Sequence, residues 1–531
     1  MKLLKYSMWL ASLAVANAKR PNILFILTDD QGKYVGGIED MPNLQSQLVQ
    51  KGATYPKHYW WNDNYLPLWM QDAGYDTYYV GKLWNSITED NYNDPPVRGF
   101  NGSEIMLDPY TYRYYESVFT RNNGAPESYA GNYSTDVIAS KAAGFLDDAL
   151  KGDRPWMLTV APNAPHANGS FDPSTGATWF GEPESAPRHA KLFPEAQAPR
   201  DNSFNTLVKG AVSWHENVPE LNKTEVDYID YFYRCRLRAL QAVDDLIGEL
   251  VDKLEKAGEL DNTYVIFSTD NGYHLGQHRL QPGKNCGFET DINVPLIIRG
   301  PGVPQNKTLD VITSHTDLAP TFLSIANSTT SGLDGQILPE LTAATTSSNK
   351  SEHVAIEYWG LAVPEGIYGY NKLRTGPGNS YENNTYKGIR LIADDYSIYY
   401  SVWCTNEKEF YNLKDDPHQT VNLAANPNQH ANYKVANREL PQIINRLDAL
   451  MLVLKRCSGD QCRDPWGQLH PKGYVKNLAD ALDPGFDEFY EKQPKVSFSS
   501  CETYYTIDAE GPQKFDVYGG GTEKKWFDFW A

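Results

Sequence analysis

Two strand-like segments of this sequence each end in side chains that can bind a metal ion. Ile23 to Leu27 is an apolar run that leads to Asp29 and Asp30, and Thr263 to Ser268 leads to Asp270-Asn271. In an open α/β sheet, ligands bind outside the carboxyl ends of the strands. Adjacent carboxylates repel each other unless a cation neutralises them, and oxygen ligands suit a hard cation. Asp30 alone could equally cap a helix, but two such strand ends together predict a divalent-metal site.

These segments also carry a family resemblance. L-T-D-D-Q (Leu27 to Gln31), M-P-N-L (Met41 to Leu44) and S-T-D-N-G (Ser268 to Gly272) resemble the sulfatases, in the same order, over about residues 21 to 455. The similarity is to the secreted fungal arylsulfatases and to the glucosamine-sulfatase branch. It implies that the chain binds one calcium ion through the residues that match the calcium ligands of the family, which are Asp29, Asp30, Asp270 and Asn271.

Hydrolysis of a sulfate monoester needs cations around the sulfuryl oxygens, a nucleophile, and an acid for the leaving oxygen. Lys82, in G-Y-D-T-Y-Y-V-G-K, and Lys284, in Q-P-G-K-N-C, match the sulfate-binding lysines of the family. His166 closes A-P-N-A-P-H, where the family has its substrate-facing histidine, and is the candidate general acid. His274 and His278 are further candidates for lining the pocket. Without these motifs, a lone lysine or histidine is more often a solvated or structural residue.

The nucleophile of the family is missing from this sequence. Sulfatases carry C-x-P-S-R, in which the cysteine, or sometimes a serine, is converted to formylglycine. The first cysteine here is Cys235, in C-R-L-R-A, and Ser185 to Arg188 (S-A-P-R) has its arginine one position too early. In the family the motif lies between two blocks that here match Gly52 to Tyr55 and Asn64 to Pro67. A segment that includes the formylglycine precursor is therefore absent between them, around Trp60-Trp61.

Three functions are compatible with this pattern. The first is a calcium-dependent, arylsulfatase-type hydrolase of sulfate monoesters, which is inactive in this chain because the nucleophile segment is absent. The second is a non-catalytic relative that binds calcium and sulfated ligands. The third is a phosphatase or phosphodiesterase of the same superfamily, but Thr54 occupies an ordinary strand position and such enzymes need further Asp and His ligands for a second metal. The matching ligands, lysines and histidine favour the first hypothesis.

Composition and the N-terminus predict a secreted protein. The 531 residues include 48 basic and 67 acidic residues, for a net charge of −19, which argues against nucleic acid or an anionic membrane as partner. Lys2 and Lys5, the apolar Met8 to Ala16, and the A-N-A site ending at Ala18 form a signal peptide over residues 1–18. No later segment has the apolar length needed to span a bilayer. We therefore expect a secreted chain that binds small-molecule or glycan sulfate esters.

Sequons and cysteines agree with export. We expect N-glycosylation among the sequon asparagines, which are Asn101, Asn132, Asn168, Asn222, Asn306, Asn327, Asn349 and Asn383. Six cysteines allow fifteen pairings, and the sequence does not choose among them. Cys457 and Cys462 flank the short S-G-D-Q loop and are the best disulfide candidates.

The order of the predicted elements indicates an α/β fold. Apolar strands alternate with helices as far as about residue 326, and the longest helix spans Thr224 to Ala257. With the resemblance, this predicts an alkaline-phosphatase-like, mixed but mostly parallel sheet flanked by helices. We expect this domain over residues 21–340, a small C-terminal α+β domain with an antiparallel sheet over 352–465, and an extension over 466–531. The Thr/Ser-rich stretch Leu341 to Ser351 is a plausible linker.

Overall fold

The computed structural model describes residues 19–35, 37–49, 53–56, 65–172, 177–309, 311–339, 341, 351–369, 381–430 and 433–519. Its main feature is a sheet in the order β12, β2, β11, β10, β1, β7, β3, β4, β5, β6. The strands from β10 to β4 run parallel, whereas β11 and β5 are antiparallel to their neighbours. The bounds are β1 (Asn22–Thr28), β2 (Ala53–Pro56), β3 (Asp76–Gly81), β4 (Gly102–Met106), β5 (Val118–Arg121), β6 (Pro126–Ser128), β7 (Trp156–Ala161), β10 (Thr263–Thr269), β11 (Pro295–Arg299) and β12 (Lys307–Thr308).

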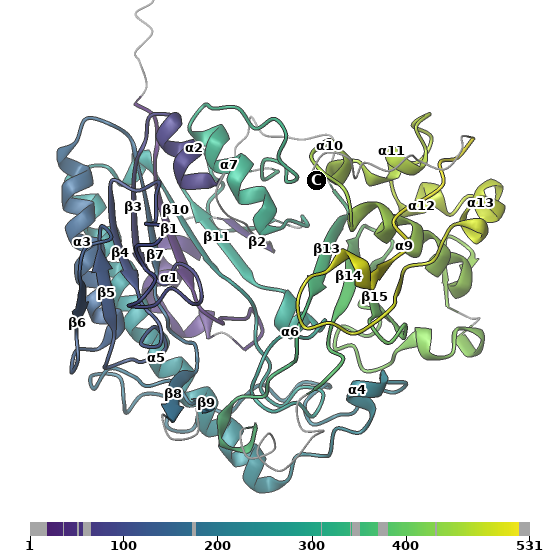
Figure 1. The fold of residues 1–531 in the computed structure, drawn as a ribbon, viewed down its shortest axis with the longest axis horizontal. Coiled ribbons are helices and arrows are strands. Elements are labelled where there is room, and N and C mark those ends of the chain that lie inside the picture. Colours follow the sequence, from purple (N-terminus) through teal and green to yellow (C-terminus); the bar gives the residue numbers. More distant parts are fainter. Residues whose placement is uncertain are drawn as a thin grey trace, which may run out of the picture.

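Helices cover both faces of this sheet (Figure 1). Alternate residues of β1 point to opposite faces, as in any strand. Leu24 and Ile26 pack into the core under α3 (Ser134–Lys151) and α5 (Lys223–Ala257). Ile23 and Phe25 pack into the core under α2 and α7. This explains the unbroken apolar run of β1, which is buried on both sides. The smaller helices of this part are α1 (Pro42–Leu44), α2 (Leu66–Asp72), α4 (Ser213–Glu216), α6 (Glu289–Ile292) and α7 (Leu318–Ile325).

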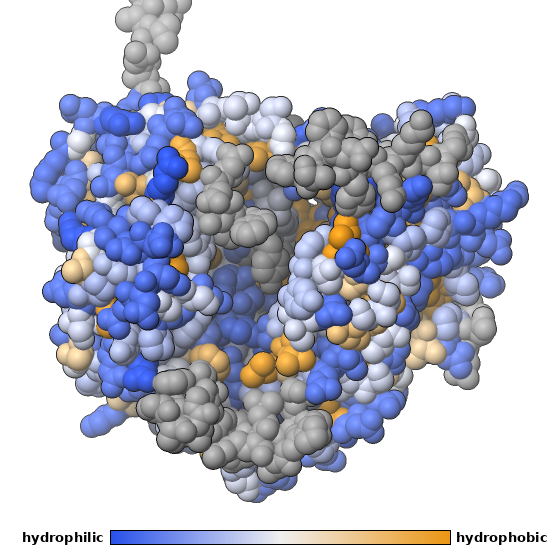
Figure 2. Space-filling model, viewed as in Figure 1, coloured by the Kyte–Doolittle hydropathy of each residue, from blue (hydrophilic) through white to orange (hydrophobic). Residues whose placement is uncertain are grey.

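A second sheet forms the C-terminal part. It is antiparallel, in the order β13 (His353–Tyr358), β14 (Tyr386–Ile392), β15 (Ser397–Trp403), β16 (Lys408–Asn412), and α9 (Leu440–Leu454) packs on it. The two parts share a core cluster that joins Phe288 of the first to Tyr399 of the second. Figure 2 shows the molecule hollowed between them, with hydrophilic side chains on the walls. The predicted fold class is therefore confirmed.

The C-terminal extension completes the core of the second part. Trp466, Tyr490 and Phe515 are buried in the same cluster as α9. A disulfide joins Cys404 to Cys501, and another joins the predicted pair Cys457 and Cys462. The remaining elements here are α10 (Asp460–Arg463), α11 (Pro465–Leu469), α12 (Leu478–Ala481), α13 (Asp487–Lys492), β17 (Lys434–Val435), β18 (Arg438–Glu439), β19 (Ser497–Phe498) and β20 (Glu510–Gly511). The predicted domain boundaries stay a prediction.

Several segments differ from the prediction or lie outside the described residues. The short strands β4, β5 and β6 at the sheet edge were not predicted from the sequence. A separate hairpin, also not predicted, is formed by β8 (Asn168–Asp172) and β9 (Ala177–Gly181). The signal peptide, the Trp60-Trp61 junction and most of the linker lie outside the described residues. Within the described chain, no helix is long and apolar enough to cross a membrane.

Candidate active site

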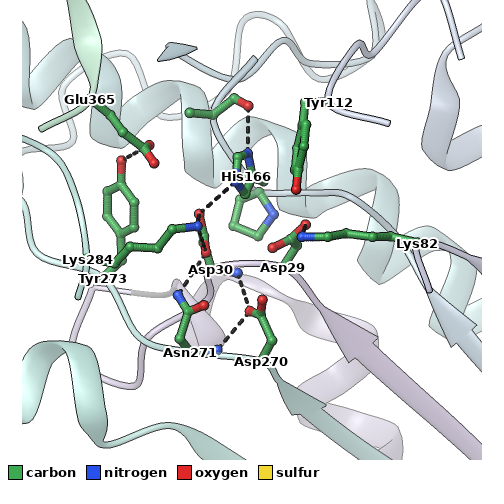
Figure 3. Close-up of polar contacts among 12 residues, drawn as sticks. Asp29, Asp30, Lys82, Tyr112, His166, Asp270, Asn271, Tyr273, Lys284 and Glu365 are labelled. Atoms are coloured by element: carbon green, nitrogen blue, oxygen red, sulfur yellow. Dashed lines mark hydrogen bonds and ion pairs between the residues drawn. The ribbon is translucent and has the colours of Figure 1, made fainter. Parts of the chain in front are cut away.

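The ends of β1 and β10 bring the predicted metal ligands together. The two strands are parallel neighbours, with Thr28 paired to Thr269, so the residues that follow leave the sheet side by side. The backbone N–H of Asp30 donates to Asp270 Oδ1 at 2.9 Å, and Asn271 Nδ2 donates to Asp30 Oδ1 at 2.8 Å. Figure 3 shows these side chains around one small space. The sequence has the same pattern twice, an apolar strand followed by polar residues. Because the two strands are neighbours, their polar residues lie next to each other.

The two predicted lysines pair with the two adjacent carboxylates. Lys82 directly follows β3, and its Nζ lies 2.8 Å from Asp29 Oδ2. Lys284 lies on the loop before α6, and its Nζ lies 2.6 and 2.8 Å from the two carboxylate oxygens of Asp30. Burial alone would lower the pKa of each lysine, but Asp29 and Asp30 hold both pKa values above the usual range. Both ammonium groups are therefore positively charged at neutral pH.

His166 lies opposite the lysines at the end of the loop after β7. Its Nε2 is 3.6 Å from Asp30 Oδ2, and its Nδ1 is 2.8 Å from the carbonyl oxygen of Ala167. The ring of Tyr112 packs against the imidazole with 4.2 Å between ring centroids, and Phe180 approaches edge-on at 5.4 Å. Burial, assisted by the positive charge of Lys284, lowers the pKa of His166 to about 4. The imidazole is therefore neutral at pH 7 and has one nitrogen facing the carboxylates.

Burial opposes ionisation of all three carboxyl groups at the site, and the neighbouring charges raise or lower each pKa in turn. Burial, followed by the charges of Asp29 and Asp30, raises the pKa of Asp270 to about 7. Burial likewise raises the pKa of Asp29, whose Oδ1 is buried and accepts no hydrogen bond from the described residues. Burial opposes ionisation of Asp30 too, but Lys284 and His166 hold its pKa below the ordinary value. An orphaned, buried oxygen among mutually repelling carboxylates is the environment that a bound cation stabilises.

Ligand atoms of Asp29, Asp30 and His166 all lie within 4.8 Å of one another. The described residues thus include acidic groups close enough together to hold a metal ion. Carboxylate and amide oxygens dominate the surroundings, and this donor set suits a hard cation better than a soft one. Chemically, the arrangement can bind an anion through two ammonium groups and a cation, beside a neutral imidazole.

Arg236, Tyr273 and Glu365 are residues at this site that were not predicted. Arg236 of α5 is 1% exposed and donates to the backbone oxygens of Asp30 and of Pro165, the residue before His166. Its guanidinium lies 3.9 Å from the ring centroid of Tyr273, whose hydroxyl donates to Glu365. The sequence contained a signal for Arg236, since it precedes Leu240 by one helical turn on the apolar face of the helix.

His274 and His278 have partners of their own in the structure. His274 is 3% exposed, with Nδ1 3.0 Å from both carboxylate oxygens of Asp291. His278 is 2% exposed and stacks on Phe288, with 3.8 Å between ring centroids. Neither belongs to the group around Asp30, and their role in lining the pocket stays a prediction.

The comparisons with known proteins agree on the family. The sulfatase family model matches residues 60–328. The chain is 39% identical to sulfatase ppz1 of Metarhizium majus, over 79% of this chain and 88% of that protein. It is 35% identical to an arylsulfatase of Volvox carteri, over 83% of this chain and 69% of that protein. It is 27% identical to the N-acetylglucosamine-6-sulfatase of Homo sapiens, over 91% of this chain and 90% of that protein.

The fold is also found among solved structures. A protein solved in complex with its substrate, D-glucosamine-2-N,6-O-disulfate, superposes with a TM-score of 0.61. It is 22% identical, and the match covers 76% of this chain and 93% of that one. This superposition shows that the chain has the same fold as that protein, which agrees with the mixed sheet and the small antiparallel sheet described above. The chain therefore belongs to the sulfatase family, the hydrolases of sulfuric esters.

Proposed function

We propose that this chain binds a calcium ion and a sulfate monoester at the site around Asp30. Asp29, Asp30, Asp270 and Asn271 hold the calcium through side-chain oxygens, and an amide flip of Asn271 presents Oδ1 in place of Nδ2. The observation that carries the proposal is the meeting of two strand ends and two lysines at the adjacent residues Asp29 and Asp30, where Lys82 pairs with Asp29 and Lys284 with Asp30. A bound calcium ion would add positive charge for the sulfuryl oxygens.

In this proposal each remaining side chain has one task. Lys82 and Lys284 bind the sulfuryl oxygens, because their charges act on an anion that is already present in the ground state. His166 faces the leaving oxygen, where a neutral imidazole nitrogen can form a hydrogen bond with the ester or exchange a proton. Tyr112 supplies an aromatic wall beside His166 and suits an aryl or sugar ring.

The proposal also states that the chain binds without turnover. Covalent catalysis needs an activated nucleophile, and the sequence has no C-x-P-S-R segment from which formylglycine could form. The residues present therefore cannot form that group. The free cysteines of the described chain, Cys235 and Cys286, are no substitutes. Both are buried, and burial raises the thiol pKa of Cys235 to about 11 and that of Cys286 well above its usual range.

Binding and turnover are tested together. Protein co-expressed with a formylglycine-generating enzyme is assayed with p-nitrophenyl sulfate, and binding of the same ester is measured by calorimetry with and without calcium. We expect calcium-dependent binding, no turnover, and at least tenfold weaker binding in Lys284→Met, because one of two ammonium contacts is lost. Lys307→Met, at an exposed lysine of β12, is the matched control. Turnover that disappears in His166→Ala would require another nucleophile and would overturn the proposal.

The genomic sequence can distinguish between two hypotheses, that the chain is an incomplete enzyme or that it is a non-catalytic relative. If the genomic sequence between the codons of Trp60 and Trp61 contains an open frame encoding C-x-P-x-R, the gene encodes an arylsulfatase-type enzyme, of which this chain is a shortened product. A continuous genomic sequence at that point would favour a non-catalytic protein that binds calcium and sulfated ligands.

We infer that the chain is exported and glycosylated. Relatives of this chain include proteins named as extracellular sulfatases. Among the sequon asparagines of the described chain, Asn168 is half-buried. The exposed ones are Asn101, Asn132, Asn222, Asn306, Asn327 and Asn383. N-terminal sequencing of secreted material should find a start after Ala18 or Arg20, and deglycosylation should reduce its mass. Retention in the cell with Met1 intact would contradict this inference.

A further inference from the structure

A segment from the C-terminal part reaches the candidate site. We call residues 360–367, which follow β13 after Trp359, the strap. The strap packs on the loop that carries Lys284, because the backbone N–H of Glu365 donates to Pro282 O at 2.6 Å. The next turn is held by Tyr228, whose hydroxyl accepts from the N–H of Ile367 at 3.1 Å. The strap is thus held by elements of the first part of the molecule.

The strap presents one acidic side chain to the site. Tyr273 OH donates to Glu365 Oε2 at 2.5 Å, and Tyr273 is also the residue on which Arg236 lies. Figure 3 shows the Glu365 carboxylate on the same side of the site as Lys284 and facing the same space as His166. Glu365 is 5% exposed, and the side-chain hydrogen bond described for it comes from a neutral tyrosine hydroxyl. Its negative charge contributes to the raised pKa of Lys284, which agrees with this proximity.

Resting on the sulfate site proposed above, we propose that Glu365 selects the substrate by charge. It accepts a hydrogen bond from a hydroxyl or ammonium group next to the sulfate ester, and it repels a second anionic group at that position. The substrate class is then a monosulfated neutral or amino sugar rather than a multiply sulfated one. A carboxylate acts in this way because it is an acceptor only, and because charge repulsion is strong where water is largely excluded.

The net charge of the whole molecule also disfavours ligands with several negative charges. With a net charge of −19, the chain repels polyanions at long range, whereas a small monosulfate carries one charge and is attracted locally by Lys82 and Lys284. Local and long-range electrostatics therefore both disfavour a densely sulfated glycan.

The test compares three probes on the wild type and Glu365→Gln by calorimetry in the presence of calcium. The probes are p-nitrophenyl sulfate, glucosamine 6-sulfate with its ammonium group, and D-glucosamine-2-N,6-O-disulfate with a second anion. In the wild type we expect the amino monosulfate to bind at least tenfold more tightly than the disulfate. In Glu365→Gln this ratio should fall at least tenfold, while the affinity for p-nitrophenyl sulfate changes less than threefold.

Two further variants separate charge from structure. Tyr273→Phe removes the hydrogen bond to Glu365 but keeps its charge, so the preference for the monosulfate should persist. Glu382→Gln, at an exposed acidic residue of the same part, should leave all three affinities unchanged. If the wild type binds the three probes and Glu365→Gln leaves the ratio unchanged, this inference is overturned and the sulfate site stands. If the wild type binds none of them, the proposed function fails, and this inference fails with it.

Discussion

Arg236 is the residue that ties the metal-ligand end of β1 to the loop of His166. It is a buried cation whose described hydrogen bonds go to two backbone oxygens, those of Asp30 and Pro165. Asp30 adopts a left-handed backbone conformation, with φ of 66°, which is costly for a residue other than glycine. The guanidinium holds the carbonyl of Asp30 in this conformation, and its positive charge helps to keep the carboxyl ionised.

Replacing this guanidinium should weaken both stability and calcium binding. Arg236→Met keeps the length of the side chain but leaves two carbonyl oxygens without their donor, at a cost of about 1–3 kcal/mol. Calcium affinity should fall at least tenfold, since Asp30 is released. Arg238→Met is the control, because Arg238 lies on the same helix and bonds the backbone of Leu192 away from the site. Equal calcium affinity in the two variants would show that Arg236 does not position the ligands.

The site residues that could be predicted are those marked by a pattern in the neighbouring sequence. Asp29 and Asp270 follow apolar runs, so their place at a sheet edge follows from the strands. Arg236 reads as an ordinary charge on a long helix unless its place on the apolar face is noticed. Glu365 comes from another part of the chain and reaches the site only through tertiary packing, so no local pattern indicates it.

At the scale of elements, β15 and β16 bury an acidic residue between them. Glu409 is 1% exposed and accepts from Trp403 Nε1 at 3.0 Å and from Tyr411 OH at 2.8 Å. Burial raises its pKa to about 7, although these hydrogen bonds act against the shift. The folded protein therefore keeps a proton on Glu409 at pH values where the unfolded chain, with a pKa of about 4.3, has lost it.

Stability should consequently decline as pH rises between these two values. The contribution of Glu409 is fully present below pH of about 4 and is lost as pH rises through about 7, at a cost on the order of 3–4 kcal/mol. Glu409→Gln mimics the protonated form and removes this loss. Melting temperatures from pH 5 to pH 8 should show the variant gaining on the wild type as pH rises. A difference that does not change with pH would mean that Glu409 is ionised in the fold.

The elements themselves were predicted best where they are long or fully buried. β1, β10 and α5 have apolar runs or apolar faces that extend over several turns or a whole strand, and the structure has them close to the predicted bounds. The short strands β4, β5 and β6 were not predicted, because polar residues and glycine interrupt their apolar pattern. Their place at the sheet edge is decided by pairing with neighbours rather than by local sequence.

At the scale of the whole molecule, the C-terminal extension is tied to the second sheet by the disulfide between Cys404 and Cys501. The bridge spans 97 residues, whereas the Cys457–Cys462 bridge spans 5. Chain entropy makes the longer loop worth about 5 kcal/mol and the shorter one about 2 kcal/mol. Replacing both cysteines of the longer bridge by serine should therefore lower the melting temperature more than the same change at the shorter bridge. Equal losses would show that the extension is held by packing alone.

The central claim is that the ends of β1 and β10 form a calcium site. Calorimetric titration of calcium into the wild type should show one bound ion. Its affinity should be lower than in relatives with a formylglycine, because an oxygen ligand is replaced by water. Asp270→Ala should abolish this binding, and Asp252→Ala, at an exposed position of α5, should leave it unchanged. If Asp270→Ala binds calcium as tightly as the wild type, the site is not where we place it.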